Sequence, residues 1–277
     1  MKIVHLDSGR QMRGGQWQVL QLIAALAEAG HEQVLVAPPD GPLARQVKIP
    51  VQAPLSWWPR GDIYHAHDAR MHTWAALLGR RPLVVARRVA FPVKNRWKYR
   101  LADCYIAVSE AVAGELRRAG VEESRIRVVY DGVPELARST RMGPVIAPAS
   151  EDPMKGTDLI RESGVACRFS EDLVGDLATA SAMVYITRQE GLGSAALLAM
   201  SAGVPVIASR VGGLPEIVRE GETGVLVENT GAAIRAAVAR VGEMGALGER
   251  GREMVRERFL LRHMADATLR VYREMAR

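Results

Sequence analysis

Short runs of apolar, often β-branched residues alternate along the chain with segments of helical periodicity. This alternation is typical of a parallel β-sheet whose strands are connected by helices. In the first half of the chain it predicts six strands, at Lys2–Leu6, Gln33–Ala37, Ile63–His65, Leu83–Ala86, Tyr105–Val108 and Arg127–Tyr130. Between the first two strands, apolar residues from Val19 to Leu26 recur with the spacing of one helix face, and Gly30 is placed to end that helix.

The pattern is interrupted at residues 131–144, which contain proline and glycine without periodicity and are interpreted as a linker. A second series follows, with predicted strands at Val145–Ala147, Ala166–Phe169, Met183–Ile186, Val204–Ala208 and Gly224–Val227. Residues 246–277 have a charged helical pattern with one apolar side. The sequence therefore predicts two α/β domains with a cleft between them.

The composition is that of a globular protein, since 48% of the 277 residues are apolar and 25% are charged. It excludes a disordered tail protein, and the two cysteines are too few for a disulfide scaffold. The apolar stretch at 195–208 is interrupted by serine, glycine and proline, and is shorter than the about 18 residues of a membrane span. The first residues have a strand pattern without the features of an export signal, so we expect a cytoplasmic protein.

Basic residues are concentrated in the first half of the chain. Residues 1–130 hold 19 basic and 11 acidic side chains, whereas residues 131–277 hold 18 and 20. Eight basic residues and no acidic one lie between Arg80 and Arg100, interleaved with aromatic residues. Such a stretch could contact a phosphate-bearing substrate, an anionic membrane or a nucleic acid, and a solvated helix face is the alternative. Because no recognised nucleic-acid-binding module is visible, nucleic acid is not expected as a partner.

Glycine pairs follow predicted strands in both halves, at the sheet edge where open parallel sheets bind ligands. Gly14 and Gly15 precede the first helix, where backbone N–H groups attract a phosphate or a sugar, although such a pair also serves a plain tight turn. Neither a G-x-G-x-x-G nor a Walker A motif is present. In the second half, Glu190–Gly193 and Gly212–Gly213 occupy similar positions, and Glu190 places an acid where a ligand would lie.

In their order and spacing these segments resemble the glycosyltransferases of family 4, a GT-B group that transfers a sugar from an activated donor with retention at the anomeric carbon. The matching segments are Gly14–Gly15, Asp62–His67, Ala107–Val112, Val128–Val133, Lys155–Gly156, Glu190–Gly193, Gly203–Ser209, Gly212–Val218 and Thr223–Gly224. The resemblance implies an α/β GT-B fold of two Rossmann-like domains facing across a cleft. It implies an acceptor-binding domain over residues 1–133, a donor-binding domain over 134–260, and a helix over 261–277 that returns to the first domain.

The resemblance also implies roles for individual residues. Lys155 matches the basic residue that neutralises the departing diphosphate, which makes it catalytic through its charge. Glu190 matches a glutamate that contacts the donor sugar, and His67 matches a histidine near the transferred sugar. The donor-binding residues implied are Gly14, Gly15, Lys155, Glu190, Gly191, Leu192, Gly193, Leu198, Gly212 and Gly213. An Asp-x-Asp metal motif is missing, so we expect neither a cofactor nor a divalent metal. The nucleoside-diphosphate sugar is expected as the substrate.

Several positions depart from the family pattern. Leu198 stands where a second glutamate is expected, and a leucine cannot accept hydrogen bonds from the donor ribose. No arginine precedes Lys155 in residues 148–154, and Arg88 stands where many members have a histidine. Only 35 residues separate Lys155 from Glu190, too few for the strand and helix pairs that most relatives place there.

Two functions are consistent with this pattern. The first is a metal-independent retaining glycosyltransferase that acts on a glycan or on a phosphorylated or lipid-linked acceptor of envelope synthesis. The alternative is a degenerate member that binds a sugar nucleotide or a partner protein without turnover. The retained Lys155, Glu190 and glycine pairs favour the enzyme.

The basic stretch belongs to the domain that binds the acceptor in this family. We therefore predict that Arg87, Arg88 and Lys94 contact an anionic acceptor or the membrane surface that carries it. The protein would then be peripheral at the inner face of the cell membrane.

His65 and His67 alternate on one face of a predicted strand, with Asp68 and His72 nearby. This spacing could indicate a metal site. The family resemblance already accounts for a histidine at this strand end, and an imidazole that is buried and hydrogen-bonded to the backbone is the stronger competing interpretation. We therefore predict no metal here.

Overall fold

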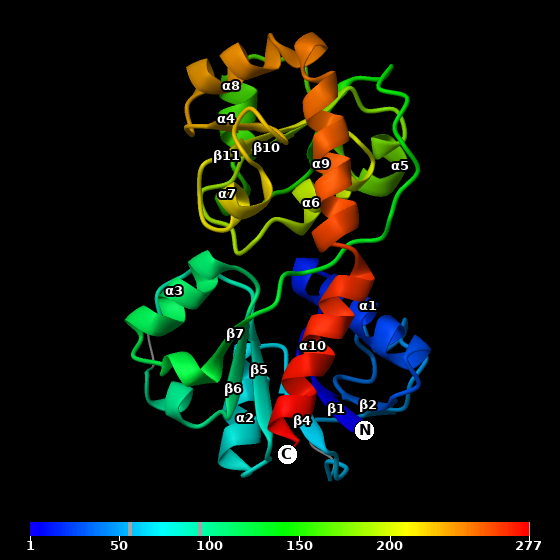
Figure 1. Ribbon diagram of the computed structural model, residues 1–277, viewed down its shortest axis with the longest axis vertical. Helices are drawn as coiled ribbons and strands as arrows, with labels where there is room; N and C mark the ends of the chain where they lie inside the picture. The colour runs from blue at the N-terminus through cyan, green and yellow to red at the C-terminus, as the bar shows by residue number, and fades with distance from the viewer. Residues whose placement is uncertain (55–56, 94–95, 277) are drawn as a thin grey trace. The chain divides into compact units, whose positions relative to one another are not determined.

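The computed structural model describes residues 1–54, 57–93 and 96–276, and their contacts divide the chain into two compact units (Figure 1). The first unit consists of Met1–Gly132 together with Leu261–Arg277, and the second consists of Val133–Leu260. Each unit is built on its own parallel sheet. The expected pair of α/β domains is therefore present.

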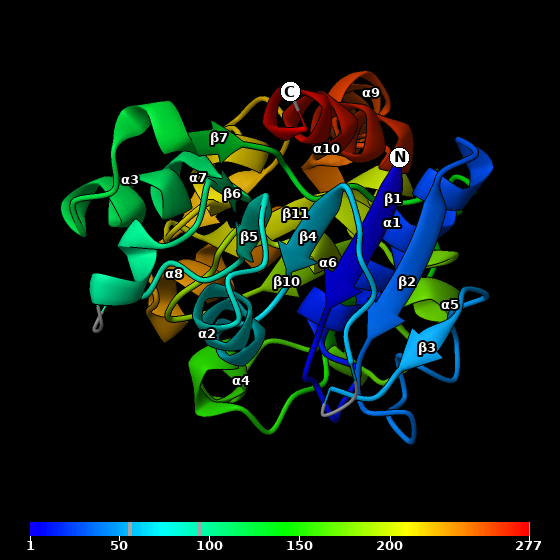
Figure 2. The same cartoon turned by 90° about the horizontal axis from the view of Figure 1, so that it is seen from below.

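The first unit contains a seven-stranded parallel sheet with the order β3-β2-β1-β4-β5-β6-β7 (Figure 2). Its strands are β1 (Lys2–Leu6), β2 (Glu32–Val36), β3 (Val51–Gln52), β4 (Ile63–Ala66), β5 (Leu83–Arg87), β6 (Cys104–Ala107) and β7 (Ile126–Val128). All six predicted strands occur, with ends shifted by no more than two residues. The short β3 was not predicted, because two residues carry no readable alternation.

Three helices connect strands of this sheet, α1 (Gly14–Glu28), α2 (Ala69–Leu77) and α3 (Glu110–Arg118), with 3₁₀ turns η1 (Trp97–Arg100) and η2 (Glu123–Arg125). The last helix of the chain, α10 (Leu261–Met275), also belongs to this unit. Two of these helices have side-chain N-caps. The Asp68 carboxylate accepts hydrogen bonds from backbone N–H groups in the first turn of α2, and the Ser109 hydroxyl accepts one from a backbone N–H group in the first turn of α3. The loops that follow β4 and β6 are fixed in this way.

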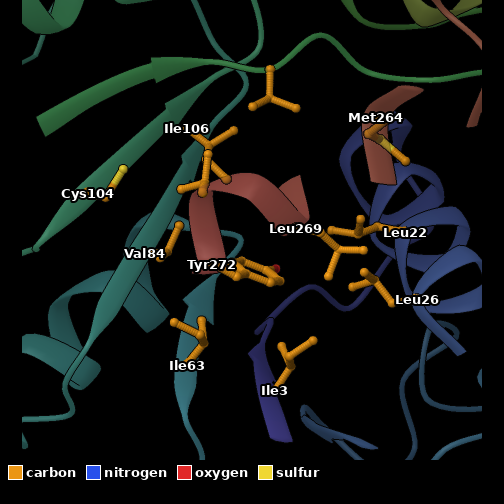
Figure 3. Close-up of a cluster of buried hydrophobic side chains, with 12 residues drawn as sticks. Ile3, Leu22, Leu26, Ile63, Val84, Cys104, Ile106, Met264, Leu269 and Tyr272 are labelled. Carbon is orange, nitrogen blue, oxygen red and sulfur yellow. The ribbon is translucent and has the colours of Figure 1, made fainter. Parts of the chain in front are cut away.

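The core of the first unit includes the C-terminal helix. Leu269 and Tyr272 of α10 pack with Leu22 of α1 over the strand residues Ile3 and Ile63 (Figure 3). Figure 1 shows α10 in red along α1, although the second unit separates the two helices in the sequence. The expected return of the last helix to the first domain is confirmed.

The second unit contains a five-stranded parallel sheet with the order β12-β11-β10-β8-β9. Its strands are β8 (Val145–Pro148), β9 (Arg168–Ser170), β10 (Ala182–Tyr185), β11 (Val206–Ser209) and β12 (Val225–Val227). These are the five predicted strands, again shifted by no more than two residues at either end. The middle strands β8, β10 and β11 direct their carboxyl ends toward the loops that hold Lys155 and Glu190.

The helices of the second unit are mostly short. They are α4 (Thr157–Glu162), α5 (Leu173–Leu177), α6 (Ser194–Ser201), α7 (Leu214–Ile217), α8 (Gly231–Val238) and α9 (Gly245–Arg258), with 3₁₀ turns η3 (Pro153–Lys155) and η4 (Val241–Glu243). Lys155 and Glu190 are 35 positions apart, and the residues between them form α4, β9, α5 and β10. The interval holds these elements because each of them is short, with three to six residues.

Among residues 1–54, 57–93 and 96–276, no helix is both long enough and apolar enough to cross a lipid bilayer.

Candidate active site

Two loops of the second unit are held together at the carboxyl edge of its sheet. The hydroxyl of Thr187, which follows β10, donates to the carbonyl of Met154 at 2.9 Å. The backbone N–H of Arg188 donates to the same carbonyl at 2.8 Å. Arg188 also forms a bidentate pair with Asp158, with N···O distances of 3.0 and 2.6 Å. These contacts fix the turn that carries Lys155 beside the loop that carries Glu190.

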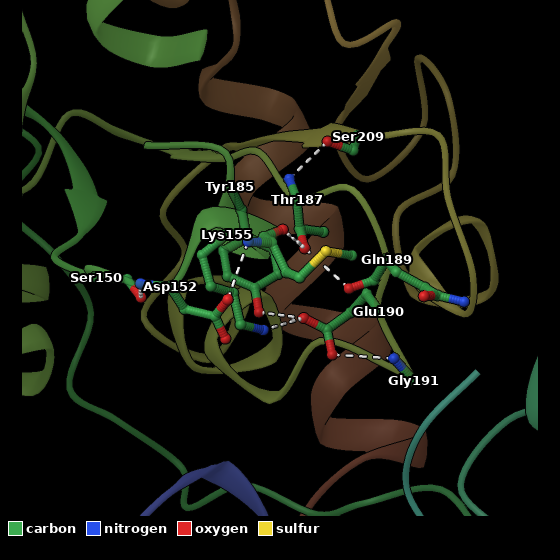
Figure 4. A network of polar contacts seen from close by, with 10 residues as sticks. Ser150, Asp152, Lys155, Tyr185, Thr187, Gln189, Glu190, Gly191 and Ser209 are labelled. Carbon is green, nitrogen blue, oxygen red and sulfur yellow. Dashed lines mark hydrogen bonds and ion pairs between the residues drawn. The ribbon is translucent and has the colours of Figure 1, made fainter. Parts of the chain in front are cut away.

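Lys155 and Glu190 meet directly. The Lys155 ammonium lies 2.9 Å from Oε2 of Glu190, and the hydroxyl of Tyr185 donates to the same oxygen at 2.6 Å (Figure 4). The other carboxylate oxygen accepts from the backbone N–H of Gly191 at 3.0 Å. The side chain of Lys155 is 37% exposed and that of Glu190 is 14% exposed. The Lys155 ammonium therefore lies at the surface, and the hydrogen bonds from Tyr185 and Gly191 orient the Glu190 carboxylate beside it.

Tyr185 was not predicted as a site residue. It is the last residue of β10 and its ring is buried, so in the sequence it resembles a core aromatic. Burial, together with the neighbouring Glu190 charge, raises the pKa of Tyr185 well above its usual value. The phenol therefore remains protonated and acts as a hydrogen-bond donor to Glu190.

The loop after β10 is also fixed from the other side. The Ser209 hydroxyl accepts from the Thr187 backbone N–H at 2.8 Å and donates to the Asn229 side-chain oxygen at 2.6 Å. The Asn229 side-chain amide donates in turn to the Thr187 carbonyl at 3.0 Å. This closed ring of hydrogen bonds ties the Glu190 loop to the ends of β11 and β12. A lysine and glutamate pair held by three strand ends is a preorganised charged site.

The second glycine pair touches Glu190 through the backbone. Gly213 donates its N–H to the Glu190 carbonyl at 3.3 Å. Gly212 has a φ of +54°, and a Cβ built on it would lie 1.9 Å from that carbonyl oxygen. Only glycine fits such an approach. The structure thus brings together Lys155, Glu190, Gly191, Gly212 and Gly213.

The remaining predicted donor residues of this unit lie on either side of the α6 start. Gly193 precedes α6, which begins without a side-chain cap. Leu192 is 2% exposed, so its side chain belongs to the core. Leu198 lies on α6 and is partly exposed, with a side chain that offers no hydrogen-bond acceptor.

The first glycine pair lies in the first unit. Gly14 and Gly15 are the first two residues of α1, and the Arg88 side chain comes within 3.8 Å of a Cβ built on Gly15. The Arg88 guanidinium lies 3.5 Å from the Asp131 carboxylate, and both side chains are largely buried. The N-terminus of α1 and the Arg88 guanidinium thus form a corner of the first unit in which Asp131 balances the arginine charge.

Two acids, the buried Asp7 and the partly buried Asp68, lie in the loops beside this corner. Asp7, directly after β1, accepts from the Gly9 backbone N–H at 2.7 Å and from the Gln16 side chain at 3.1 Å. Burial raises the pKa of Asp7. Asp68 accepts from Ser8 as well as from the first turn of α2, which ties the loops after β1 and β4 together. Asp7, which follows β1, was not predicted as part of a site. Asp68, which follows His67, was considered only as a neighbour of the histidines in a possible metal site.

Arg87 and Arg88 have different surroundings. Arg87 donates to the Tyr99 hydroxyl at 2.6 Å and to the Phe91 carbonyl. It lines a pocket of about 470 Å³ together with Val89, Phe91, Pro92, Val93, Lys98 and Tyr99. The predicted acceptor residues therefore separate into a pocket at Arg87 and a corner at Arg88, while Lys94 lies outside the described residues.

The histidines form a buried cluster. His67 is 8% exposed, and its Nε2 lies 3.0 Å from Nδ1 of His5, while Nδ1 of His65 lies 2.5 Å from the Tyr272 hydroxyl. Burial lowers the pKa of His5 to about 4 and lowers those of His65 and His67. The expected burial and hydrogen bonding are present, but these partners are side chains instead of backbone. Asp68 and His72 are engaged elsewhere, in the α2 cap and at the Lys98 carbonyl.

Two family models match overlapping parts of the chain. Glycosyltransferase Family 4 matches residues 12–135, and Glycosyl transferases group 1 matches residues 111–243. Together the two matches cover residues 12–243, which include Lys155 and Glu190.

Curated relatives share part of the sequence. N-acetyl-alpha-D-glucosaminyl L-malate synthase of Bacillus anthracis is 36% identical over 106 residues, which cover 36% of this chain and 28% of that protein. D-inositol 3-phosphate glycosyltransferase of Rhodococcus jostii is 32% identical over 163 residues, which cover 54% of this chain and 33% of that protein. The matched segments thus span about a third of these relatives' length.

Solved structures match the fold over nearly the whole chain. Anabaena Alr3699/HepE, in complex with UDP and glucose, superposes with a TM-score of 0.83 at 16% identity, covering 99% of this chain and 100% of that one. Sucrose-phosphate synthase of Thermosynechococcus elongatus superposes with a TM-score of 0.81 at 18% identity, covering 99% and 98%. The two family matches show that this chain contains a Glycosyltransferase Family 4 domain and a Glycosyl transferases group 1 domain.

Proposed function

We propose that this protein is a retaining glycosyltransferase that moves a sugar from a nucleoside-diphosphate sugar to an anionic acceptor. The observation that carries the proposal is the contact between Lys155 and Glu190, held by Tyr185 and by the Gly212–Gly213 loop. The family matches give the reaction class, and the HepE protein of the same fold was crystallised in complex with UDP and glucose.

In this mechanism the Lys155 ammonium turns from Glu190 to the donor diphosphate. Negative charge grows on the diphosphate as the bond to the sugar breaks, and a cation placed there stabilises that charge more in the transition state than in the ground state. Glu190 keeps its contacts with Tyr185 and Gly191 when the lysine leaves, so its carboxylate remains oriented toward the donor sugar. In our proposal protein cations and backbone N–H groups stabilise the diphosphate, and the transfer step needs no divalent metal.

His67 is the proposed contact to the transferred sugar in the first unit. Its Nε2 is engaged with His5, and its Nδ1 has no hydrogen-bond partner within the described residues. The roles of Gly14 and Gly15 toward the donor phosphates belong to the same proposal.

For the acceptor we propose an anion that the basic residues of the first unit recognise. Arg87 and Lys98 line one pocket with apolar and aromatic neighbours, a combination that suits a phosphate or carboxylate attached to a less polar body. The names of the two relatives mention malate and inositol 3-phosphate, which are both anionic. Contact with an anionic membrane surface that carries the acceptor is part of this proposal.

The test measures nucleoside diphosphate release and donor binding with a panel of nucleoside-diphosphate sugars, beginning with UDP-glucose. We expect Lys155→Ala to lower kcat/KM by about 10²–10³-fold, mainly through kcat, because the lost charge acts in the transition state. Lys48→Ala, which removes a lysine outside the site, is the matched control. Equal turnover by Lys155→Ala and Lys48→Ala would overturn the assignment of the catalytic cation.

The second candidate is a binding protein without turnover, and Leu198 favours it because its side chain cannot accept a ribose hydrogen bond. The same titration separates the two functions. Binding of a sugar nucleotide without diphosphate release, across donors and acceptors, would support the binding protein. Release that depends on Lys155 supports the enzyme.

A further inference from the structure

Three imidazole rings converge inside the first unit. His5 on β1 and His65 on β4 are register partners on neighbouring parallel strands, and His67 follows two residues later on the same face. His5 and His65 are 0% and 1% exposed, and His67 is 8% exposed. One ring nitrogen of each residue lies within 4.8 Å of one from each of the other two.

The hydrogen bonds assign the proton on His5. The Gln33 side-chain amide donates to the carbonyl of Ile23 at 3.0 Å, so its oxygen faces the ring. That oxygen lies 3.0 Å from Nε2 of His5 and can only accept. Nε2 therefore carries the proton, and Nδ1 presents a lone pair to the centre of the cluster, 3.0 Å from Nε2 of His67.

The other two rings are left incompletely satisfied. The Tyr272 hydroxyl engages Nδ1 of His65, while Nε2 of His65 and Nδ1 of His67 are buried without a hydrogen-bond partner among the described residues. A buried ring nitrogen that loses its bond to water destabilises the fold by about 1–3 kcal/mol. Two such atoms in one cluster require a physical reason.

We propose that His5, His65 and His67 bind a first-row transition-metal ion such as Zn²⁺ in the core of the first unit. His5 binds through Nδ1, His65 through its unpartnered Nε2, and His67 through Nε2 once its proton has moved to Nδ1 of the same ring. Three imidazoles are a ligand set that zinc, cobalt and nickel ions accept, with a fourth position for a small ligand.

The outer contacts match this assignment. Ligating histidines usually donate their second ring N–H to an oxygen that fixes the ring. Nε2 of His5 has Gln33 in that place, and Nδ1 of His65 has Tyr272. Zinc–nitrogen bonds of about 2.0–2.1 Å place the ligand atoms about 3.4 Å apart in a tetrahedral site. The ring nitrogens of His5 and His67 lie 3.0 Å apart, and one nitrogen of each of the three rings lies within 4.8 Å of the others, so small ring movements would bring them to this spacing.

Burial keeps the rings in the form that binds metal, because it lowers their pKa values and so favours neutral imidazole. The charge of Arg88 acts on His65 and His67, and Arg88 is paired with Asp131 at 3.5 Å. The ion would link β1 to β4 and, through Tyr272, to α10. Its role is structural. It shares His67 with the proposed sugar transfer, whose Lys155–Glu190 pair lies in the second unit.

The experiment uses the full chain, treated with a chelator and then titrated with ZnCl₂ or CoCl₂. We expect one ion per chain by calorimetry and elemental analysis, a higher Tm with metal, and visible Co²⁺ absorption typical of nitrogen ligands. No stoichiometric binding, or Co²⁺ spectra of the fully hydrated ion only, would overturn the proposal.

Variants locate the ion. His5→Gln removes a ligand, and we expect loss of stoichiometric binding. His72→Gln is the matched control, because His72 is also buried but lies outside the cluster. Gln33→Leu removes an outer contact only, and we expect binding about 10–100-fold weaker. Circular dichroism of the metal-free proteins shows which variants fold. Binding by a folded His5→Gln protein equal to that of the unmodified protein would show that the ion sits elsewhere and would contradict the proposal.

Discussion

At the scale of single residues, the charged site is complete without a ligand. Lys155 neutralises Glu190, and Tyr185 and Gly191 satisfy the same carboxylate. A donor diphosphate therefore competes with Glu190 for the Lys155 ammonium. When the lysine moves to the diphosphate, the Glu190 carboxylate keeps its hydrogen bonds from Tyr185 and Gly191. The pair is suited to this exchange of partners. The lysine, which must reach the diphosphate, is partly exposed and has a flexible side chain, whereas the carboxylate is largely buried.

A titratable residue outside the site gives a prediction on stability. His72 is buried against the Lys98 carbonyl, and burial, followed by the charge of Lys98, lowers the pKa of His72 from 6.5 to about 4. Between these two values the unfolded chain binds the proton and the folded chain does not. Stability is therefore lost as the pH falls from about 6.5 to about 4, at about 1.4 kcal/mol per pH unit from this group.

Urea unfolding at several pH values between about 7 and 4.5 checks this prediction. His72→Gln has no proton to take up, so its free energy of unfolding should fall less steeply over that range than that of the unmodified protein. His31→Gln, at a less buried position where burial also lowers the pKa but less strongly, is the control and should change the slope less than His72→Gln does. Parallel slopes for His72→Gln and the unmodified protein would exclude the contribution. If the free energies of unfolding of the two proteins differed by the same amount at every pH, the difference would reflect only lost packing.

At the scale of elements, the site depends on turns that pack backbone against backbone. A Cβ on Gly212 would lie 1.9 Å from the Glu190 carbonyl oxygen, and its φ of +54° is unfavourable for other residues. Gly212→Ala must therefore move the loop away from Glu190 and weaken the hydrogen bond from Gly213. We expect a loss of about 1–3 kcal/mol in stability and weaker donor binding.

The matched control is Gly221→Ala. Gly221 also has a positive φ, at +70°, but nothing lies within 4 Å of the added Cβ. This variant carries the backbone strain without the collision, so it should lose stability while keeping donor affinity. Thermal unfolding and calorimetry with UDP-glucose separate the two effects. Donor affinity reduced equally in both variants would show that the contact with Glu190 is not what matters.

The sequence predicts the strands well because each is a short apolar run with clear ends. It also singles out Glu190 and the glycine pairs, since they follow predicted strands, and it singles out Lys155 through the family resemblance. It does not predict Tyr185, because a buried aromatic at a strand end looks like core until its hydroxyl is seen at Glu190. It does not join His5 to His65, because their pairing depends on β1 and β4 being neighbours across 60 residues of chain.

At the scale of the whole molecule, the order of the elements along the chain differs from the order in which they are grouped into units. The last helix follows the second unit in the sequence but belongs to the first. Its amphipathic pattern shows that one side is buried, yet the pattern alone does not identify the surface that covers it. The contact is made by side chains such as Met264, Leu269 and Tyr272, which pack in the cluster that includes Ile3 and Ile63.

Removing residues 261–277 is the test of this arrangement. The deletion takes away four large buried side chains, Met264, Leu269, Val271 and Tyr272. Each stabilises the fold by about 1.5–3 kcal/mol through burial. Their sum is comparable to the about 5–15 kcal/mol by which a folded domain is stable. We therefore expect the first unit to lose its cooperative fold.

Hydrogen exchange resolved by segment measures the outcome, with the second unit as an internal reference. In the truncated chain, amide protection should collapse in β1 and β4, which lie beneath the lost helix, while β10 and β11 keep theirs because their core residues come from the second unit. The double variant Leu269→Ala, Tyr272→Phe leaves the helix in place and should reduce protection in β1 and β4 only partly. If truncation left β1 and β4 as protected as in the full chain, the last helix would be an accessory to the first unit, and the remaining residues alone would have to supply its core.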